Sequence, residues 1–123
     1  MAVQKLSPNQ QRRVDTIHEY QMVVVHVKRL VAELDGNRAA RAKIIDNICA
    51  TLARELSQLR QRAMTSPVGT IGDIAGALSV LAARGGSGLA FKLRGLNDGV
   101  NSLNMQLDAA MKSAMQPEKD EKH

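Results

Sequence analysis

The side chains best suited to chemistry lie near the start of the chain, in a row of His18, Met22 and His26. Steps of four residues place all three on one side of a helix. Imidazole and thioether groups bind copper or zinc, but one helix cannot surround a metal ion, so such a site needs a dimer axis. Asp15 and His18 have the spacing of half a di-iron carboxylate site, which needs a second such pair and two further carboxylates, and we do not adopt that interpretation. We therefore expect no metal or cofactor and interpret the row as an exposed helix face.

Arg13 and His18 are separated by four residues, a spacing that resembles the Arg/His pair of the helical HEPN ribonucleases. The resemblance implies an enzyme in which this pair polarises a phosphate and moves a proton. It covers these two residues alone, and two solvated polar side chains give the same pattern. A helical ribonuclease-like enzyme is the third of the functions that we consider.

Two further motifs have the composition of a reactive site. The run Gly85-Gly86-Ser87-Gly88 offers backbone N–H groups to an anion but lacks the Gly-Lys-Ser/Thr of a P-loop, so we interpret it as a helix stop. Cys49, the only cysteine, falls in an apolar helical row, which predicts a core residue. The sequence offers no nucleophile with a base, and we predict a non-enzymatic protein without catalytic residues.

The chain is basic, with 17 Lys and Arg against 12 Asp and Glu and a formal net charge of +5. Arg38, Arg41 and Lys43 cluster at the start of an expected helix, where the helix dipole disfavours cations. A phosphate or an acidic neighbour would explain them, so they are candidate contacts to an anion or nucleic acid. The alternative function is therefore a nucleic-acid-binding accessory protein that uses sequence-independent phosphate contacts, although many soluble proteins are equally basic.

Composition limits both the fold and the function. Hydrophobic residues make up 44% of the 123 residues, but there is one Phe, one Tyr and no Trp. The core must be aliphatic, and the aromatic platform on which single-stranded bases stack is missing. We predict one domain at 1–116 and a disordered charged tail at 117–123. The chain starts without a signal-peptide pattern and 67–83 is too short and glycine-rich to span a membrane, so we predict a soluble, cytoplasmic protein.

Apolar residues recur every three or four positions, which is the period of amphipathic helices. The pattern predicts an all-α antiparallel bundle with three long helices, at about 8–35, 38–64 and 88–115, and one short helix at about 70–84. Heptad spacing within the helices is typical of coiled-coil packing.

Polar and small residues mark the expected helix ends. Ser7-Pro8 is a favourable helix start, and Gly36-Asn37 combines a left-handed helix end with the cap of the next helix. Thr70 and Asp73 resemble a capping box, and Ser87 can cap the last helix.

Glycines spaced by four occur within two of the expected helices: Gly72 and Gly76, then Gly95 and Gly99. Each costs up to about 1 kcal/mol relative to alanine inside a helix. The spacing indicates close approach to another helix, and the alternative is an irregular short helix.

The longest heptad row lies in the last helix: Leu89, Leu93, Leu96, Val100, Leu103, Leu107, Ala110 and Ala114. The short helix, about 22 Å long, covers half of this row of about 40 Å. An uncovered remainder favours self-association, so we predict a homodimer or higher oligomer. Its expected seam is Leu89, Leu93, Leu96, Val100, Leu103 and Leu107.

The opposite side of the same helix carries a second candidate surface, the predicted partner face, made of Phe91, Gly95, Gly99 and Met105. Two apolar residues beside two glycines indicate a contact with another helix. We therefore favour a small interaction protein, such as a homo-oligomeric adaptor, a chaperone-like partner or an assembly subunit. It would bind an unidentified protein helix against helix.

Overall fold

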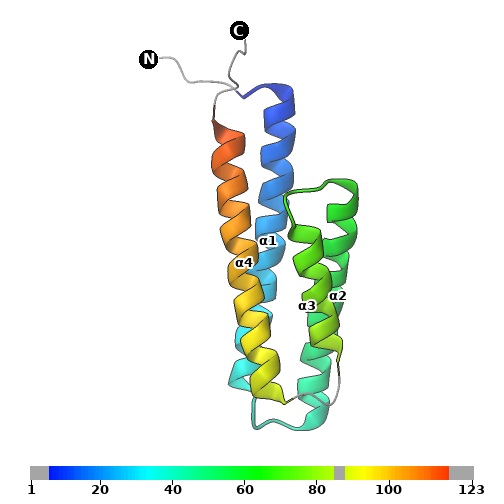
Figure 1. Cartoon of the computed structure of the whole chain (residues 1–123). Helices are drawn as coiled ribbons and strands as arrows, with labels where there is room; N and C mark the ends of the chain where they lie inside the picture. The colour runs from blue at the N-terminus through cyan, green and yellow to red at the C-terminus, as the bar shows by residue number, and fades with distance from the viewer. Residues whose placement is uncertain (1–5, 85–87, 117–123) are drawn as a thin grey trace.

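The computed structural model describes residues 6–84 and 88–116, which form four α-helices and no strand (Figure 1). The helices are α1 (Pro8–Gly36), α2 (Ala42–Thr65), α3 (Ile71–Ala83) and α4 (Leu89–Met115). The prediction of an all-α helical bundle with one short helix is therefore confirmed. Ser87 and the tail 117–123 lie outside the described residues, so the expectations about them are not tested.

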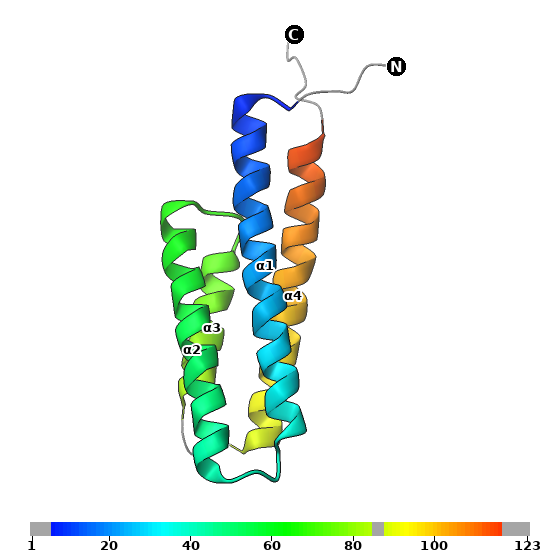
Figure 2. The same ribbon diagram turned by 180° about the vertical axis from the view of Figure 1, so that it is seen from behind.

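The four helices form two side-by-side pairs, α1 with α4 and α2 with α3 (Figures 1 and 2). The pairs meet where α3 packs on α4 and α2 packs on α1. The α1–α4 pair continues beyond the loop between α2 and α3, at the end of the bundle where α1 begins (Figure 1). The first and last helices of the chain are therefore neighbours along most of their length.

The apolar rows predicted from the sequence form the core. Val24 and Val27 of α1, Leu52 and Leu56 of α2, and Leu103 of α4 are completely buried. The run Val23-Val24-Val25 is helical although β-branched residues favour strands. Burial of its middle residue against the other helices outweighs that intrinsic preference.

The predicted start of α1 is confirmed. The Ser7 hydroxyl accepts a hydrogen bond from the Gln10 N–H at 3.1 Å, and the Gln10 side-chain oxygen accepts one from the Ser7 N–H at 2.9 Å. This reciprocal pair is a capping box, and Pro8 occupies the first helical position.

The turn between α1 and α2 differs from the prediction. Gly36 is the last residue of α1 and does not have a positive φ, and α2 begins at Ala42 rather than near residue 38. The reason is Asn37, whose side chain donates to the Glu33 carbonyl at 2.7 Å and whose backbone N–H donates to Leu34 at 3.1 Å. Asn37 thus closes α1 instead of capping α2.

The predicted capping box at the start of α3 is wrong. Thr70 makes no side-chain cap, because its hydroxyl and its N–H both donate to the Gln106 side-chain oxygen, at 2.9 and 3.1 Å. Just before it, Gly69 has a φ of 50°, which glycine adopts at little cost. The start of α3 is therefore tied to α4 instead of being capped within its own helix.

Candidate interaction surfaces

The row predicted to self-associate lies in the core of the single chain. Leu93, Leu96, Val100, Leu103 and Leu107 are at most 2% exposed, and Leu89 is half-buried. The cover comes from α1, which runs beside α4, in addition to the cover from α3 that was expected (Figure 1). The expectation that half of the row is uncovered is wrong, and the homodimer stays a prediction without that support.

The predicted partner face does not form one surface. A Cβ added at Gly95 would meet Leu81 of α3, and one at Gly99 would meet Leu78 of α3, both at separations below 3.0 Å. The close helix approach predicted from these glycines is confirmed, but it belongs to the fold itself. Phe91 and Met105 remain, 64% and 71% exposed and about 21 Å apart along α4.

The glycines of α3 make a second close contact on its other side. A Cβ at Gly72 would lie 3.2 Å from the Cβ of Ala63, and one at Gly76 would lie 2.8 Å from the Arg60 Cδ, both on α2. The short helix is regular throughout, so the alternative of an irregular short helix is wrong. It approaches α2 through its own glycines and α4 through the glycines of α4.

The predicted anion contacts Arg38, Arg41 and Lys43 are all exposed at the turn between α1 and α2. The Arg38 Nε donates to the Asp35 carboxylate at 2.7 Å, so one of the three has an acidic neighbour. Arg84 follows the end of α3 at the same end of the bundle (Figure 1). This end therefore carries positive charge from two separate turns.

The row of His18, Met22 and His26 borders a groove between α1 and α2. Val23 and Glu19 complete the α1 side, and Glu55 and Arg62 line it from α2, around a volume of about 470 Å³. Met22 is 56% exposed and Val23 is half-buried, so apolar atoms are accessible between polar edges. The row on α1 is recognisable from residue spacing, whereas the helix that faces it is not.

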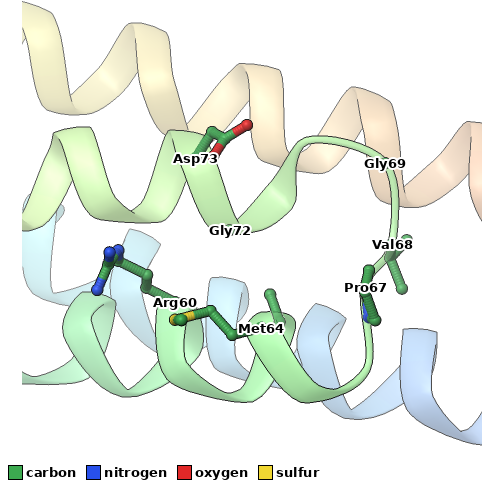
Figure 3. A pocket seen from close by; sticks show the side chains of 8 residues that line it. Arg60, Met64, Pro67, Val68, Gly69, Gly72 and Asp73 are labelled. Atoms are coloured by element: carbon green, nitrogen blue, oxygen red, sulfur yellow. The ribbon is translucent and has the colours of Figure 1, made fainter.

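A second hollow, of about 400 Å³, lies beside the loop between α2 and α3 (Figure 3). Arg60 and Met64 line it from α2, and Gly72 and Asp73 from α3. Figure 3 shows the Asp73 carboxylate directed away from α2, where Arg60 lies. The hollow therefore does not bring a charged pair together for catalysis.

Tyr20 links α1 to the loop that joins α2 and α3. The residue is 1% exposed, and its hydroxyl donates to the Ser66 carbonyl at 2.8 Å. Burial raises the pKa of the Tyr20 phenol, and nearby Glu19 raises it further, against lowering by Arg62 and the hydrogen bond. The phenol stays protonated at neutral pH and serves the fold as a hydrogen-bond donor.

One buried polar residue escaped the sequence analysis. Lys92 is 8% exposed, and its Nζ lies 3.3 Å from the Ala82 carbonyl and 3.9 Å from the Cys49 Sγ. Its position, three residues after Leu89 and four before Leu96, places it along the edge of the apolar row and could have indicated burial. Cys49 is buried, as predicted.

Comparisons with protein-family models, curated proteins and solved structures give no match for this chain. Within residues 6–84 and 88–116, no three His, Cys, Asp or Glu residues are placed to hold a metal ion. No helix in the same ranges combines the length and apolarity needed to cross a membrane. The class defined by the structure is an antiparallel four-helix bundle with an open groove between its first two helices.

Proposed function

We propose that this chain is a non-enzymatic helical interaction protein, present in the cytoplasm, that binds a helix of a protein partner between α1 and α2. The observation that supports this most directly is the composition of the groove. Met22 and Val23 offer apolar surface, and His18, Glu55 and Arg62 stand at its edges. An apolar strip between polar edges is complementary to an amphipathic helix.

A further exposed apolar side chain, that of Ile44, lies on α2 toward the first turn of the bundle, beyond the residues that line the groove. Ile44 precedes Arg62 by about five helical turns and so lies on the same side of α2. Its side chain is 45% exposed. A partner helix of about 27 Å reaches from one to the other. Covering the exposed parts of Met22 and Ile44 contributes about 2 kcal/mol each.

The charges along the groove define the partner's polar edges. Glu19 and Glu55 are acidic and Arg62 is basic, and all three line the same groove. The complementary helix carries basic residues opposite the two glutamates and an acidic residue opposite Arg62. Such rim charges set orientation and association rate more than affinity.

Site-specific photo-crosslinking in native lysate tests the proposal. The photoreactive residue p-benzoylphenylalanine replaces Met22, and in matched variants Met105 on α4 or Arg54 on α2, both exposed. With nuclease present, we expect a protein adduct at Met22 at least about tenfold stronger than at Arg54. Adding Ile44→Glu to the Met22 variant should reduce that adduct about tenfold, because an apolar contact near one end of the partner helix becomes a buried charge.

Other patterns of crosslinking would contradict the groove or identify a different site or occupant. Equal adducts at Met22 and Arg54 would contradict a specific groove, and an adduct at Met105 alone would transfer the site to α4. An adduct of twice the chain mass would identify a second copy as the occupant and support the homodimer. Circular dichroism of every variant separates loss of binding from loss of fold.

Binding to nucleic acid is the second candidate, favoured by Arg84 lying at the same end of the bundle as Arg41 and Lys43. Affinity for duplex DNA or RNA that falls steeply with salt would support it. The double variant Arg41→Gln and Lys43→Gln should then flatten the salt dependence by about two counterions. A groove-binding protein should show neither effect.

A further inference from the structure

Lys92 is the one charged side chain in the buried set of the described residues, and its amine faces the only thiol of the sequence. The Nζ of Lys92 on α4 lies 3.9 Å from the Sγ of Cys49 on α2. The two residues are 8% and 6% exposed. Three helices meet at this point, because the same amine also contacts Ala82 in the last turn of α3.

The carbonyl of Ala82 explains only part of the arrangement. Carbonyls in the last turn of a helix lack a donor within the helix, and Lys92 supplies one at 3.3 Å. An ammonium has three N–H donors, however, and its removal from water is unfavourable. An apolar residue at position 92 would avoid that cost. The contact with sulfur is the feature that such a residue could not provide.

We propose that Cys49 and Lys92 form an oxidative cross-linking site, at which a peroxide joins α2 to α4 through a sulfur–nitrogen bond. In the first step the Cys49 sulfur attacks hydrogen peroxide and the O–O bond breaks, giving a sulfenic acid and water. In the second step the uncharged Lys92 amine attacks that sulfur, the S–O bond breaks, and the hydroxyl leaves with an amine proton as water. The pair loses two hydrogens in total, and the peroxide is reduced to two waters.

Local geometry favours the amine as the group that traps the oxidised sulfur. Peroxide is little larger than water, and Cys49 is 6% exposed, so small oxidants are the ones with access. No second cysteine exists in the sequence to form a disulfide within the chain. Lys92 carries its amine on a flexible four-carbon stem, so the 3.9 Å separation closes without movement of the helices.

Peptide mapping of the native chain tests the cross-link. The chain is treated with hydrogen peroxide at pH 9, where a fraction of ordinary lysine amines is uncharged, and is then digested with trypsin. Mapping is needed because exposed methionines such as Met22 and Met105 also gain oxygen. We expect peptide 44–54 joined to peptide 85–94, uncut at Lys92 and about 2 Da lighter than the two free peptides together. Dithiothreitol should separate them again.

Two variants provide the controls. Lys92→Arg keeps a long cation but removes the nucleophilic amine, so only oxygen addition at Cys49 is expected. Lys112→Arg, at an exposed position of α4, should cross-link like the native chain. Cleavage at Lys92 with oxygen on Cys49, a joined peptide heavier by one oxygen, or an unmodified Cys49 would each overturn the proposal. The native chain decides these outcomes even where Lys92→Arg does not fold.

Discussion

The two helix pairs of the bundle are packed in different ways. The α1–α4 pair is long, and the rows that α1 and α4 contribute to the core consist of large side chains such as Val24, Val27 and Leu103. The shorter α3 approaches α2 through Gly72 and Gly76. A row of large residues stabilises a pair by burying apolar area, whereas glycines stabilise it by allowing the backbones to approach. Loss of side-chain volume should therefore be most costly in the first region, whereas the effect of added volume at the glycines depends on what the new atoms meet.

The largest effect should come from removing a large side chain from the core row of α4. Leu103 is completely buried, so Leu103→Ala should lower the free energy of unfolding by about 3 kcal/mol, through lost apolar contact and a cavity. Urea denaturation measures the change. Met105→Ala, two residues further on and exposed, is the matched control and should change it by less than about 0.5 kcal/mol. Similar losses for the two variants would contradict burial as the source of stability.

The glycine contacts should respond to an added methyl according to what it meets. At Gly99 a Cβ would come within 3.0 Å of three side-chain carbons of Leu78, which is buried and cannot move aside. Gly99→Ala should therefore destabilise the chain by about 1–2 kcal/mol despite its better helix propensity.

Gly76→Ala is the control, because its Cβ would meet the flexible side chain of exposed Arg60. It should stabilise the chain by about 0.5–1 kcal/mol, since the higher helix propensity of alanine is then not offset. Thermal unfolding of both variants decides between them. If both variants stabilised the chain, or both destabilised it, the difference between the Leu78 and Arg60 contacts would not control the effect of the added methyl.

A similarly small effect concerns the polar link between the pairs. Tyr20→Phe should cost about 1 kcal/mol at pH 7, because the Ser66 carbonyl loses its donor. Burial raises the pKa of Tyr20, so its contribution is complete below about pH 10, the ordinary pKa of tyrosine. The contribution is lost as pH rises through the higher folded-state pKa.

Urea denaturation of the native chain and of Tyr20→Phe at pH 7 to 11 measures this effect. The advantage of the native chain should shrink above pH 10. Tyr20 is the only tyrosine, so tyrosinate absorbance reports its ionisation directly. An advantage that grew with pH would contradict the assigned direction of the pKa.

The helices were predictable because periodicity is local, and the cap at Ser7 was predictable because its partner Gln10 is three residues away. Most of what failed depended on partners far along the chain, and the exception is Asn37, which is bonded to nearby Glu33 and Leu34. Thr70 is bonded to Gln106 rather than to its own helix. Glycine spacing indicated a close approach but could not name the neighbour, which is α3 for Gly99.

The candidate surfaces show the same contrast between what nearby residues determine and what distant partners determine. The apolar row of α4 was correctly placed on one helix face, but its cover comes from α1 at the other end of the sequence. The row from His18 to His26 was also correctly placed on one side of α1, and the groove appears only when α2 is set beside it. Residue spacing thus specifies a face, and the fold decides what that face meets.

The Gln10 side chain has a consequence for how the chain can be connected. Its amide donates to the carbonyls of Ala114 and Gln116, at 3.4 and 2.6 Å, so the first turn of α1 is tied to the last turn of α4. The start of α1 and the end of α4 are therefore neighbours, like the helix ends that the three turns of the bundle connect. A circular permutant in which a linker joins these two ends, and which is opened at the turn after Asn37, would keep every helix contact while beginning with α2.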